Sequence, residues 1–269
     1  MKSLISAINY KTRKNLTVKL GAIIAAIMVV GGVLMFYGFL KIATGELIEA
    51  AGGYDTDLEA FDDINFLDCA AITLSLMQVI SIVCAVVITI IITAEKKNGA
   101  YSLMISRGYT YKQVYMSKIY ETVLVSFVIY IAYVAASLII GGILWHGEIE
   151  DGYVAGFIRM VLLLLLMYVA SSMIYLMVAM NTKNAGAAIA INLCIILILS
   201  GIMTGIDQAI WDEDAVVRKF WILSAIEQFA YIEKTDETTM EIFIGIIESI
   251  IYGGGSCLAG YKLFKARRL

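Results

Sequence analysis

Apolar residues are gathered into long uninterrupted blocks, and short polar segments separate these blocks along the 269-residue chain. A helix that crosses the hydrocarbon core of a bilayer needs about 20 predominantly apolar residues. Six blocks meet this requirement, at about 20–40, 70–94, 119–144, 156–180, 185–206 and 241–261. The pattern predicts an all-α polytopic membrane protein with a single transmembrane domain over residues 1–269.

Two further segments are apolar but too short to cross a bilayer. Residues 1–16 are predicted to form an amphipathic helix on the membrane surface, because one helical face collects Met1, Leu4, Ile5, Ile8 and Leu16. The alternative is a frayed basic tail, which suits residues 9–15 better than the first eight. Residues 216–233 are expected to form short helices that dip into the outer leaflet or pack over the spans.

The distribution of charge predicts the orientation of the spans. Charged residues make up only 16% of the chain and hydrophobic residues 61%, although a typical soluble domain carries about 25% charge. Basic residues gather in 1–19, 95–118 and the C-terminal tail, whereas 41–69 and 145–155 are acidic. Because Lys and Arg favour the cytoplasmic side, we expect a multi-pass protein of the cell membrane with both termini in the cytoplasm.

The basic segment 95–118 has an apolar centre, "AYSLMI", between Gly99 and Gly108. As a two-turn helix it would place Tyr101, Met104 and Ile105 on one face. Such a short helix is not stable alone in water, because nucleation is costly. Either it rests on lipid head groups, or it docks in a groove of a cytoplasmic partner.

Two capping boxes precede predicted spans. In this motif a Ser or Thr side chain and a Glu or Gln three residues later satisfy backbone amides of the first turn. Thr110 and Gln113 form one box, which predicts that the third helix begins at Tyr111. Thr238 and Glu241 form the other, before the sixth span.

The stretch "AEKKNGAYSLMISRGYTYKQVYMSK" resembles the cytoplasmic loop of type-2 ABC transporter permease subunits. The family has a glutamate at the end of span two, a basic-Gly stretch, a short coupling helix, and an Arg and a Lys entering span three; the residues that match in that order are Glu95, Gly99, Arg107 and Lys118. The resemblance covers almost the whole chain, including the N-terminal elbow helix and the short helices before span six. One departure is Ile105, where the family often has proline, so the bend there is expected to rely on Gly108.

The resemblance implies a permease subunit of an ATP-driven exporter that moves an amphipathic or hydrophobic substrate. Its partners would be a cytoplasmic ABC ATPase and a second permease chain, forming a homodimer or a heterodimer, with no nucleic acid. ATP and Mg would bind only the ATPase, since this chain lacks the phosphate-loop motif. The residues implied in ATPase coupling are Glu95, Gly99, Tyr101, Leu103, Met104, Ile105, Arg107 and Gly108.

Small and polar residues within the spans are further candidates. The small-xxx-small pairs Gly21/Ala25 and Gly186/Ala190 favour close helix contacts, and the resemblance assigns both to the dimer interface. The intramembrane polar candidates are Gln78, Arg159, Asn192 and Glu248. For Gln78 and Asn192 interhelical hydrogen bonds are favoured over substrate binding. Arg159 is expected to pair with Glu248 or to reach the membrane surface, and Glu121 to pair with Lys118.

Other classes of function have less support in the sequence. An intramembrane protease would need a membrane-embedded Ser/His pair or an H-E-x-x-H motif, but the only histidine is His146, in a short acidic loop. No catalytic or metal-binding residue is therefore predicted. A secondary transporter or channel, or a non-transporting assembly or sensor subunit, stays an alternative. The glycines at 253–255 are either a hinge or a packing face.

Overall fold

The described residues form helices joined by turns. The computed structural model describes residues 2–50, 66–75, 77–144, 153–210, 217–229 and 238–266, and within these ranges there is no strand. His146 and most of the predicted acidic loops lie outside them. The predicted all-α polytopic fold is confirmed, because six described helices are long and apolar enough to cross a membrane.

The described helices are distributed over both halves of the chain. The first half of the chain contains α1 (Lys2–Lys14), α2 (Leu16–Ala50), α4 (Phe66–Ser75), α5 (Met77–Lys97), α6 (Ala100–Ser106), α7 (Tyr111–Leu144) and α8 (Tyr153–Asn181). The second half contains α9 (Ala185–Cys194), η1 (Ile195–Leu199), α10 (Ser200–Ile210), η2 (Arg218–Phe220), α11 (Ile222–Phe229), α12 (Thr238–Ser249), η3 (Ile250–Gly254) and α13 (Gly255–Ala266). Helix α2 continues to Ala50, about ten residues beyond the predicted span, because good helix formers follow the apolar block.

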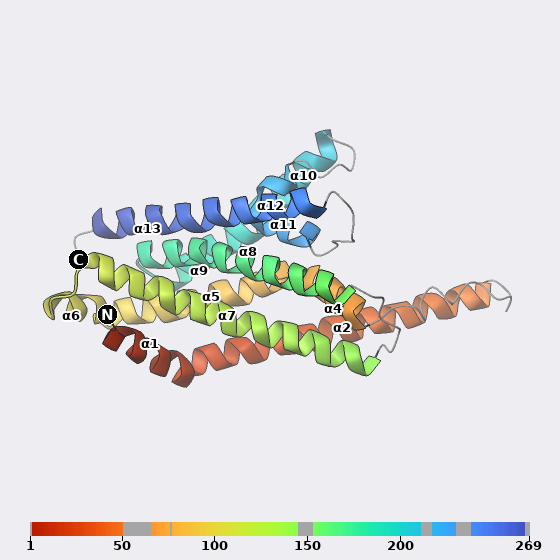
Figure 1. Cartoon of the computed structure of the whole chain (residues 1–269), viewed down its shortest axis with the longest axis horizontal. Coiled ribbons are helices and arrows are strands. Elements are labelled where there is room, and N and C mark those ends of the chain that lie inside the picture. Colours follow the sequence, from red (N-terminus) through yellow and green to blue (C-terminus); the bar gives the residue numbers. More distant parts are fainter. Residues whose placement is uncertain are drawn as a thin grey trace.

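Figure 1 shows the long helices running side by side, with both chain termini and α6 at the same end. We call this the basic end, because α1, the last turn of α5 and the last turn of α13 all carry lysines there. Helix α10 lies at the opposite end and diverges from the bundle (Figure 1).

The predicted N-terminal amphipathic helix is confirmed as α1, and it extends through Lys14 rather than fraying at residue 9. Asn15 separates it from α2 and caps that helix, since its Oδ1 accepts a hydrogen bond from the Thr17 amide at 3.0 Å. Its inward face packs against α7: Ile8 is buried, and the Tyr120 hydroxyl donates to Asn9 Oδ1 at 2.9 Å. This helix is therefore part of the bundle.

Helices α5 and α8 contribute about half of the buried hydrophobic core, and their buried serine hydroxyls are satisfied within the helices. Ser81 donates to the Met77 carbonyl and Ser171 to the Tyr168 carbonyl, one turn earlier in each helix. Hydrogen bonds also link neighbouring spans: Thr73 Oγ1 donates to Ser137 Oγ at 2.8 Å. Buried polar groups need such partners where no water is available.

The small pair in α2 packs inside the chain, which contradicts its predicted place in a dimer interface. Ala25 is fully buried, and a Cβ added at Gly21 would lie 2.6 Å from Val87 Cγ2 of α5. The absence of a side chain at Gly21 lets α2 approach α5 closely. Small-residue spacing predicted a close helix contact but could not tell which helix makes it.

The predicted short helices before the sixth span are confirmed as η2 and α11. Trp221, Ile222 and Leu223 are buried, so this segment packs over the spans. Trp221 Nε1 donates to Ser200 Oγ at 3.1 Å, and its ring meets the Tyr252 ring edge-on at 5.4 Å. These contacts join α11 to α10 and η3.

Spans five and six each contain one π-helical turn, η1 and η3, which no pattern in the sequence predicted. The glycines at 253–255 lie across the end of η3. A Cβ at Gly253 would meet Ala170 Cβ of α8 at 3.2 Å, whereas nothing lies within 4 Å of such an atom at Gly254 or Gly255. Gly253 is therefore a packing position against α8.

The two neighbouring glycines provide a matched test of this contact. Gly253→Leu should lower the free energy of unfolding by about 1–3 kcal/mol, because the Ala170 backbone stands in the way of the added side chain. Gly254→Leu has open space and should leave it unchanged or raise it. Thermal unfolding of the purified variants in detergent measures both. Equal melting temperatures would mean that η3 does not pack closely on α8.

Candidate coupling site at the basic end

Helix α6 is seven residues long, and a glycine in the left-handed region stands at each end of it. Gly99 is the N-cap with φ 69°, and Gly108 follows the C-cap with φ 89°. The Gly108 amide donates to the Ile105 carbonyl at 2.9 Å and the Tyr109 amide to the Met104 carbonyl at 3.2 Å. This pair of bonds is a Schellman motif. The predicted reliance of this bend on Gly108 is confirmed.

The capping box that connects α6 to α7 is also confirmed. The Gln113 amide donates to Thr110 Oγ1 at 3.3 Å, and the Thr110 amide donates to Gln113 Oε1 at 2.9 Å. Helix α7 begins at Tyr111, as predicted. Only Tyr109 and Thr110 separate the Schellman turn from this helix, so α6 is joined to α7 without a flexible linker. The side chains of the second predicted box, at Thr238 and Glu241, lie outside the described residues.

Tyr101 does not belong to an exposed docking face, contrary to the prediction. Its side chain is buried, and its hydroxyl donates to the Ile92 carbonyl at 3.0 Å. Its ring meets Phe264 of α13 edge-on at 6.2 Å, and Lys118 Nζ lies 5.6 Å from the ring centre. Tyr101 therefore fastens α6 to α5, α7 and α13. The helical spacing was correct, but the apolar face that contains Tyr101 turns toward the bundle.

The outward side of α6 is formed by other residues of the predicted set. Leu103 is 53% exposed, and Arg107 and Gly108 are also exposed. Met104 and Ile105 are half-buried against the core. The surface that α6 presents is thus a leucine with two partly covered apolar neighbours and one cation.

Four charged side chains from α1, α5 and α7 form an ion-pair network behind α6. Lys118 Nζ pairs with Glu121 Oε2 at 2.6 Å and also with Glu95 Oε2. Lys11 pairs with Glu121 Oε1 at 2.9 Å and with Glu95 Oε1. The predicted pairing of Lys118 with Glu121 is confirmed. No sequence signal connected Lys11 with residues more than 80 positions away.

The network balances two ammonium groups against two carboxylates. The side chains of Lys118 and Glu121 are 2% and 3% exposed, so neither charge has access to much water. Burial lowers the pKa of the Lys11 ammonium, and attraction from Glu121 opposes this effect. Because the buried charges compensate one another, the ends of α1, α5 and α7 are held in one arrangement.

The remaining spans join this end through polar and aromatic contacts. Lys96 Nζ donates to the Met180 and Thr182 carbonyls, both at 2.9 Å, where the C-terminal end of α8 favours a cation. Phe264 of α13 lies against Tyr111 and Tyr115 of α7, with ring centres about 6 Å apart. A displacement of α6 would therefore act on α5, α7, α8 and α13, which are connected to one another.

The two predicted polar residues at mid-span make interhelical contacts. Asn192 Nδ2 donates to Thr89 Oγ1 at 3.0 Å and joins α9 to α5. Gln78 Nε2 reaches the Ile196 carbonyl in η1 at 3.4 Å, which is long for a hydrogen bond. Asn192 thus forms the interhelical hydrogen bond that the sequence favoured, whereas the contact of Gln78 is a weak one.

Arg159 and Glu248 do not form an ion pair in the structure. Glu248 is 5% exposed, and within the described part of the chain neither of its carboxyl oxygens has a hydrogen-bond partner. Arg159 is exposed on α8, in keeping with the other option, an arginine that reaches toward the membrane surface. The expectation that both residues lie near the outer ends of their spans was not sufficient to predict which side chain each of them would meet.

The small pair in span five, unlike the one in span one, lies on the surface of the chain. Gly186 and Ala190 are exposed on α9, and nothing lies within 4 Å of a Cβ added at Gly186. This face of α9 is therefore open to another helix or to lipid.

Residues 55–254 match the family model described as "Protein of unknown function (DUF2705)", and the chain belongs to this family. None of the curated proteins matches the chain.

Removing the Lys118 ammonium tests the network. Lys118→Met should lower the free energy of unfolding by about 3–5 kcal/mol, because Glu95 and Glu121 keep their charges with only Lys11 as a partner. Lys112→Met, the same change at an exposed lysine of the same helix, should have an effect within about 0.5 kcal/mol. Thermal unfolding in detergent measures both.

The double variant Lys118→Met/Glu121→Gln should recover part of the loss, because it removes one of the uncompensated carboxylates. If Lys118→Met unfolds at the same temperature as Lys112→Met, the network does not hold the basic end together.

Tyr101 makes the stability of the folded chain depend on pH in the alkaline range. Burial raises the pKa of its phenol far above the usual value of about 10, and the Glu121 charge acts in the same direction. Above pH 10 the unfolded chain therefore loses the proton that the folded chain keeps, so stability falls as pH rises. Between pH 8 and pH 11 the melting temperature of Tyr101→Phe should fall less than that of the natural chain. This is expected even though the variant lacks the hydrogen bond to the Ile92 carbonyl.

Tyr10→Phe is the control for this measurement, because the Tyr10 ring is 64% exposed. It should follow the natural chain over the whole pH range. An equally steep alkaline loss in Tyr101→Phe would show that the phenol is not held in its neutral form.

Proposed function

We propose that the chain is the permease subunit of an ATP-driven exporter in the cell membrane, with α6 as the helix that receives movement from a separate ATPase. The observation that carries the proposal is the construction of α6. It projects at the basic end, it is clamped by two turns and by Tyr101, and it exposes Leu103. A surface helix built only to rest on lipid does not need rigid connections to two spans.

The orientation follows from the same end of the molecule. Lys11, Lys96, Lys97, Lys112, Lys118 and Lys265 are all on helix ends that meet there. Positively charged loops are retained on the cytoplasmic side during insertion, so we place the basic end and both termini in the cytoplasm. Helix α6 is then accessible to a cytoplasmic ATPase.

The expected mechanism is a rigid transfer of motion. An ATPase that grips Leu103, Met104 and Ile105 would move α6, and the Schellman turn and capping box would pass this motion to α7. The network of Lys118 with Glu95 and Lys11 would carry α5 and α1 along. ATP hydrolysis, with its Mg ion, belongs to the ATPase in this proposal, and this chain contributes no covalent chemistry.

A second permease chain would complete the pathway. The exposed Gly186 and Ala190 on α9 are the positions where a helix of that chain could approach most closely. The substrate is proposed to be amphipathic or hydrophobic, such as a peptide, an antibiotic or a lipid-like molecule, because the described interior is mostly apolar.

A proton-coupled secondary transporter is a second candidate, and Glu248 is the observation that favours it. A buried carboxyl without a described partner inside a span is a typical functional group of such proteins. Transport by this class would proceed without ATP, which separates it from the first candidate.

The ATPase interaction is tested by purifying the tagged chain from its own cells and measuring vanadate-sensitive ATP hydrolysis in the preparation. Leu103→Asp should reduce that activity at least about tenfold, because a desolvated charge would enter the apolar contact. Leu263→Asp is the matched control, since Leu263 is 50% exposed near the basic end but lies on α13. Full ATPase activity in Leu103→Asp, or none in the natural chain, would contradict the proposal.

A further inference from the structure

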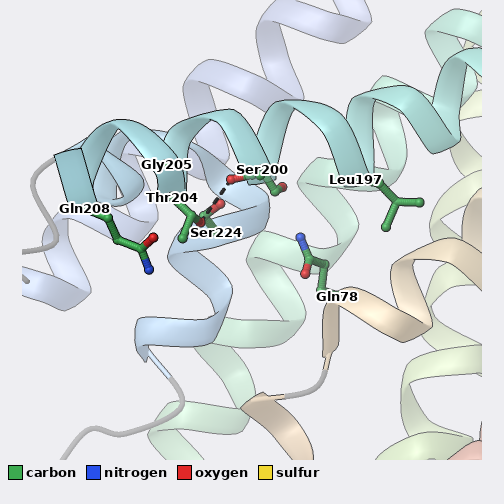
Figure 2. Close-up of a pocket in the computed structure, with 8 residues that line it drawn as sticks. Gln78, Leu197, Ser200, Thr204, Gly205, Gln208 and Ser224 are labelled. Atoms are coloured by element: carbon green, nitrogen blue, oxygen red, sulfur yellow. Dashed lines mark hydrogen bonds between the residues drawn. The ribbon is translucent and has the colours of Figure 1, made fainter.

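A hollow of about 300 Å³ lies between α5, α10 and α11, away from the basic end. Its described lining includes five hydrogen-bonding side chains, Gln78, Ser200, Thr204, Gln208 and Ser224, which Figure 2 shows around one space. The volume is at the lower end of the range for small-molecule sites, roughly 300–1,000 Å³. We call it the α10 groove.

The spacing of residues along α10 creates the groove. Ser200, Thr204 and Gln208 recur every four residues, so they share one face of the helix. Gly201 and Gly205 lie beside them, and nothing is within 4 Å of a Cβ added at either position. The π-helical turn η1 directly precedes this face, and π-turns inside α-helices are frequent at functional sites.

Some hydrogen-bonding groups of the groove are not satisfied by the described parts of the protein. Ser224 is 2% exposed, yet its hydroxyl has no partner there. A buried hydroxyl without a partner is unfavourable, because it has given up its bonds to water. Gln78 makes only the long contact to Ile196. The groove thus holds donors and acceptors that a ligand could satisfy.

The α10 side of the groove becomes more polar toward the end of the span, whereas Gln78 of α5 lies at the inner part, near Ile196. Leu197, 55% exposed, lies at the end nearer the middle of span five, and Ile198 beside it is 56% exposed. Gln208 lies near the last residues of α10, at the end of the span. The described lining carries no charged side chain. A ligand that fits is apolar toward the middle of the membrane and uncharged but hydrogen-bonding at its surface.

We propose that the α10 groove binds a membrane glycolipid, with its uncharged sugar head group against Ser224, Thr204 and Gln78 and an acyl chain along Leu197. Sugar hydroxyls both donate and accept, as the Ser, Thr and Gln side chains do. A phosphate head group would instead call for Arg or Lys, which the described lining lacks. This site does not depend on the proposed export function.

A second copy of the chain is a less suitable occupant. Close helix pairing in membranes uses flat faces of small residues that allow backbones to approach, whereas this surface is hollowed and carries three polar side chains on α10. The exposed small-residue face of span five is at Gly186 and Ala190, in the preceding helix α9.

The test is native mass spectrometry of the full-length chain in detergent, titrated with diglucosyl diacylglycerol and with phosphatidylglycerol of the same acyl chains. We expect the glycolipid to bind at least about tenfold more tightly than the phospholipid. Gly205→Leu should weaken glycolipid binding at least about tenfold by filling the hollow. Ser224→Val should weaken it about fivefold, through the loss of one hydrogen bond.

Gly142→Leu is the matched control, because Gly142 is also an exposed helical glycine with open space around it, but on α7. Both leucine variants should melt no lower than the natural chain, since leucine favours helix more than glycine does. Equal binding of the two lipids, or unchanged glycolipid binding in Gly205→Leu, would overturn the proposal. So would a lipid-free dimer of the natural chain that Gly205→Leu converts to monomers.

Discussion

The buried ammonium group of Lys118 is the interaction on which the basic end of the molecule depends. An unpaired charge in this environment would be very unfavourable, and a single carboxylate would leave some hydrogen-bond donors of the ammonium group without a partner. The chain supplies Glu121 from the same helix, Glu95 from α5 and a second cation, Lys11, from α1. Three helices must therefore meet for the charges to balance. The position of the N-terminal helix and the joint between α5 and α7 follow from this requirement.

The position of α5 beside α7 determines how the short helix α6 between them must be oriented. Since α5 and α7 are fixed side by side, the segment from Asn98 to Thr110 must reverse the direction of the chain, and left-handed glycines at 99 and 108 provide two bends for this reversal. Tyr101 then turns inward and lies beside Lys118 and Phe264. Leu103, two residues further on, points the other way. The same apolar sequence thus supplies both the anchor and the exposed surface.

Sequence reasoning succeeded where structure depends on near neighbours. The six spans, the capping box at Thr110 and Gln113, the bend at Gly108 and the pair of Lys118 with Glu121 all follow from residues within a few positions of one another. It failed where the outcome depends on which helix is adjacent. Gly21 packs against α5 of the same chain, and Arg159 and Glu248 do not form an ion pair. No local pattern indicated Lys11 or the π-helical turns, because their causes lie in the packing of distant segments.

The two ends of the bundle are held by different kinds of interaction. At the basic end, ion pairs, a lysine on the α8 carbonyls and edge-on or tilted aromatic contacts connect α1, α5, α7, α8 and α13. At the other end, α10 diverges from the bundle and is joined to α11 by the bond of Trp221 to Ser200 and by the capture of the Val217 amide by Asp207 at 2.6 Å. Single hydrogen bonds are weaker links than a desolvated charge network whose members cannot separate without losing compensation. The molecule is therefore firmly joined where α6 is attached and more loosely joined around the α10 groove, where a ligand would find unsatisfied groups.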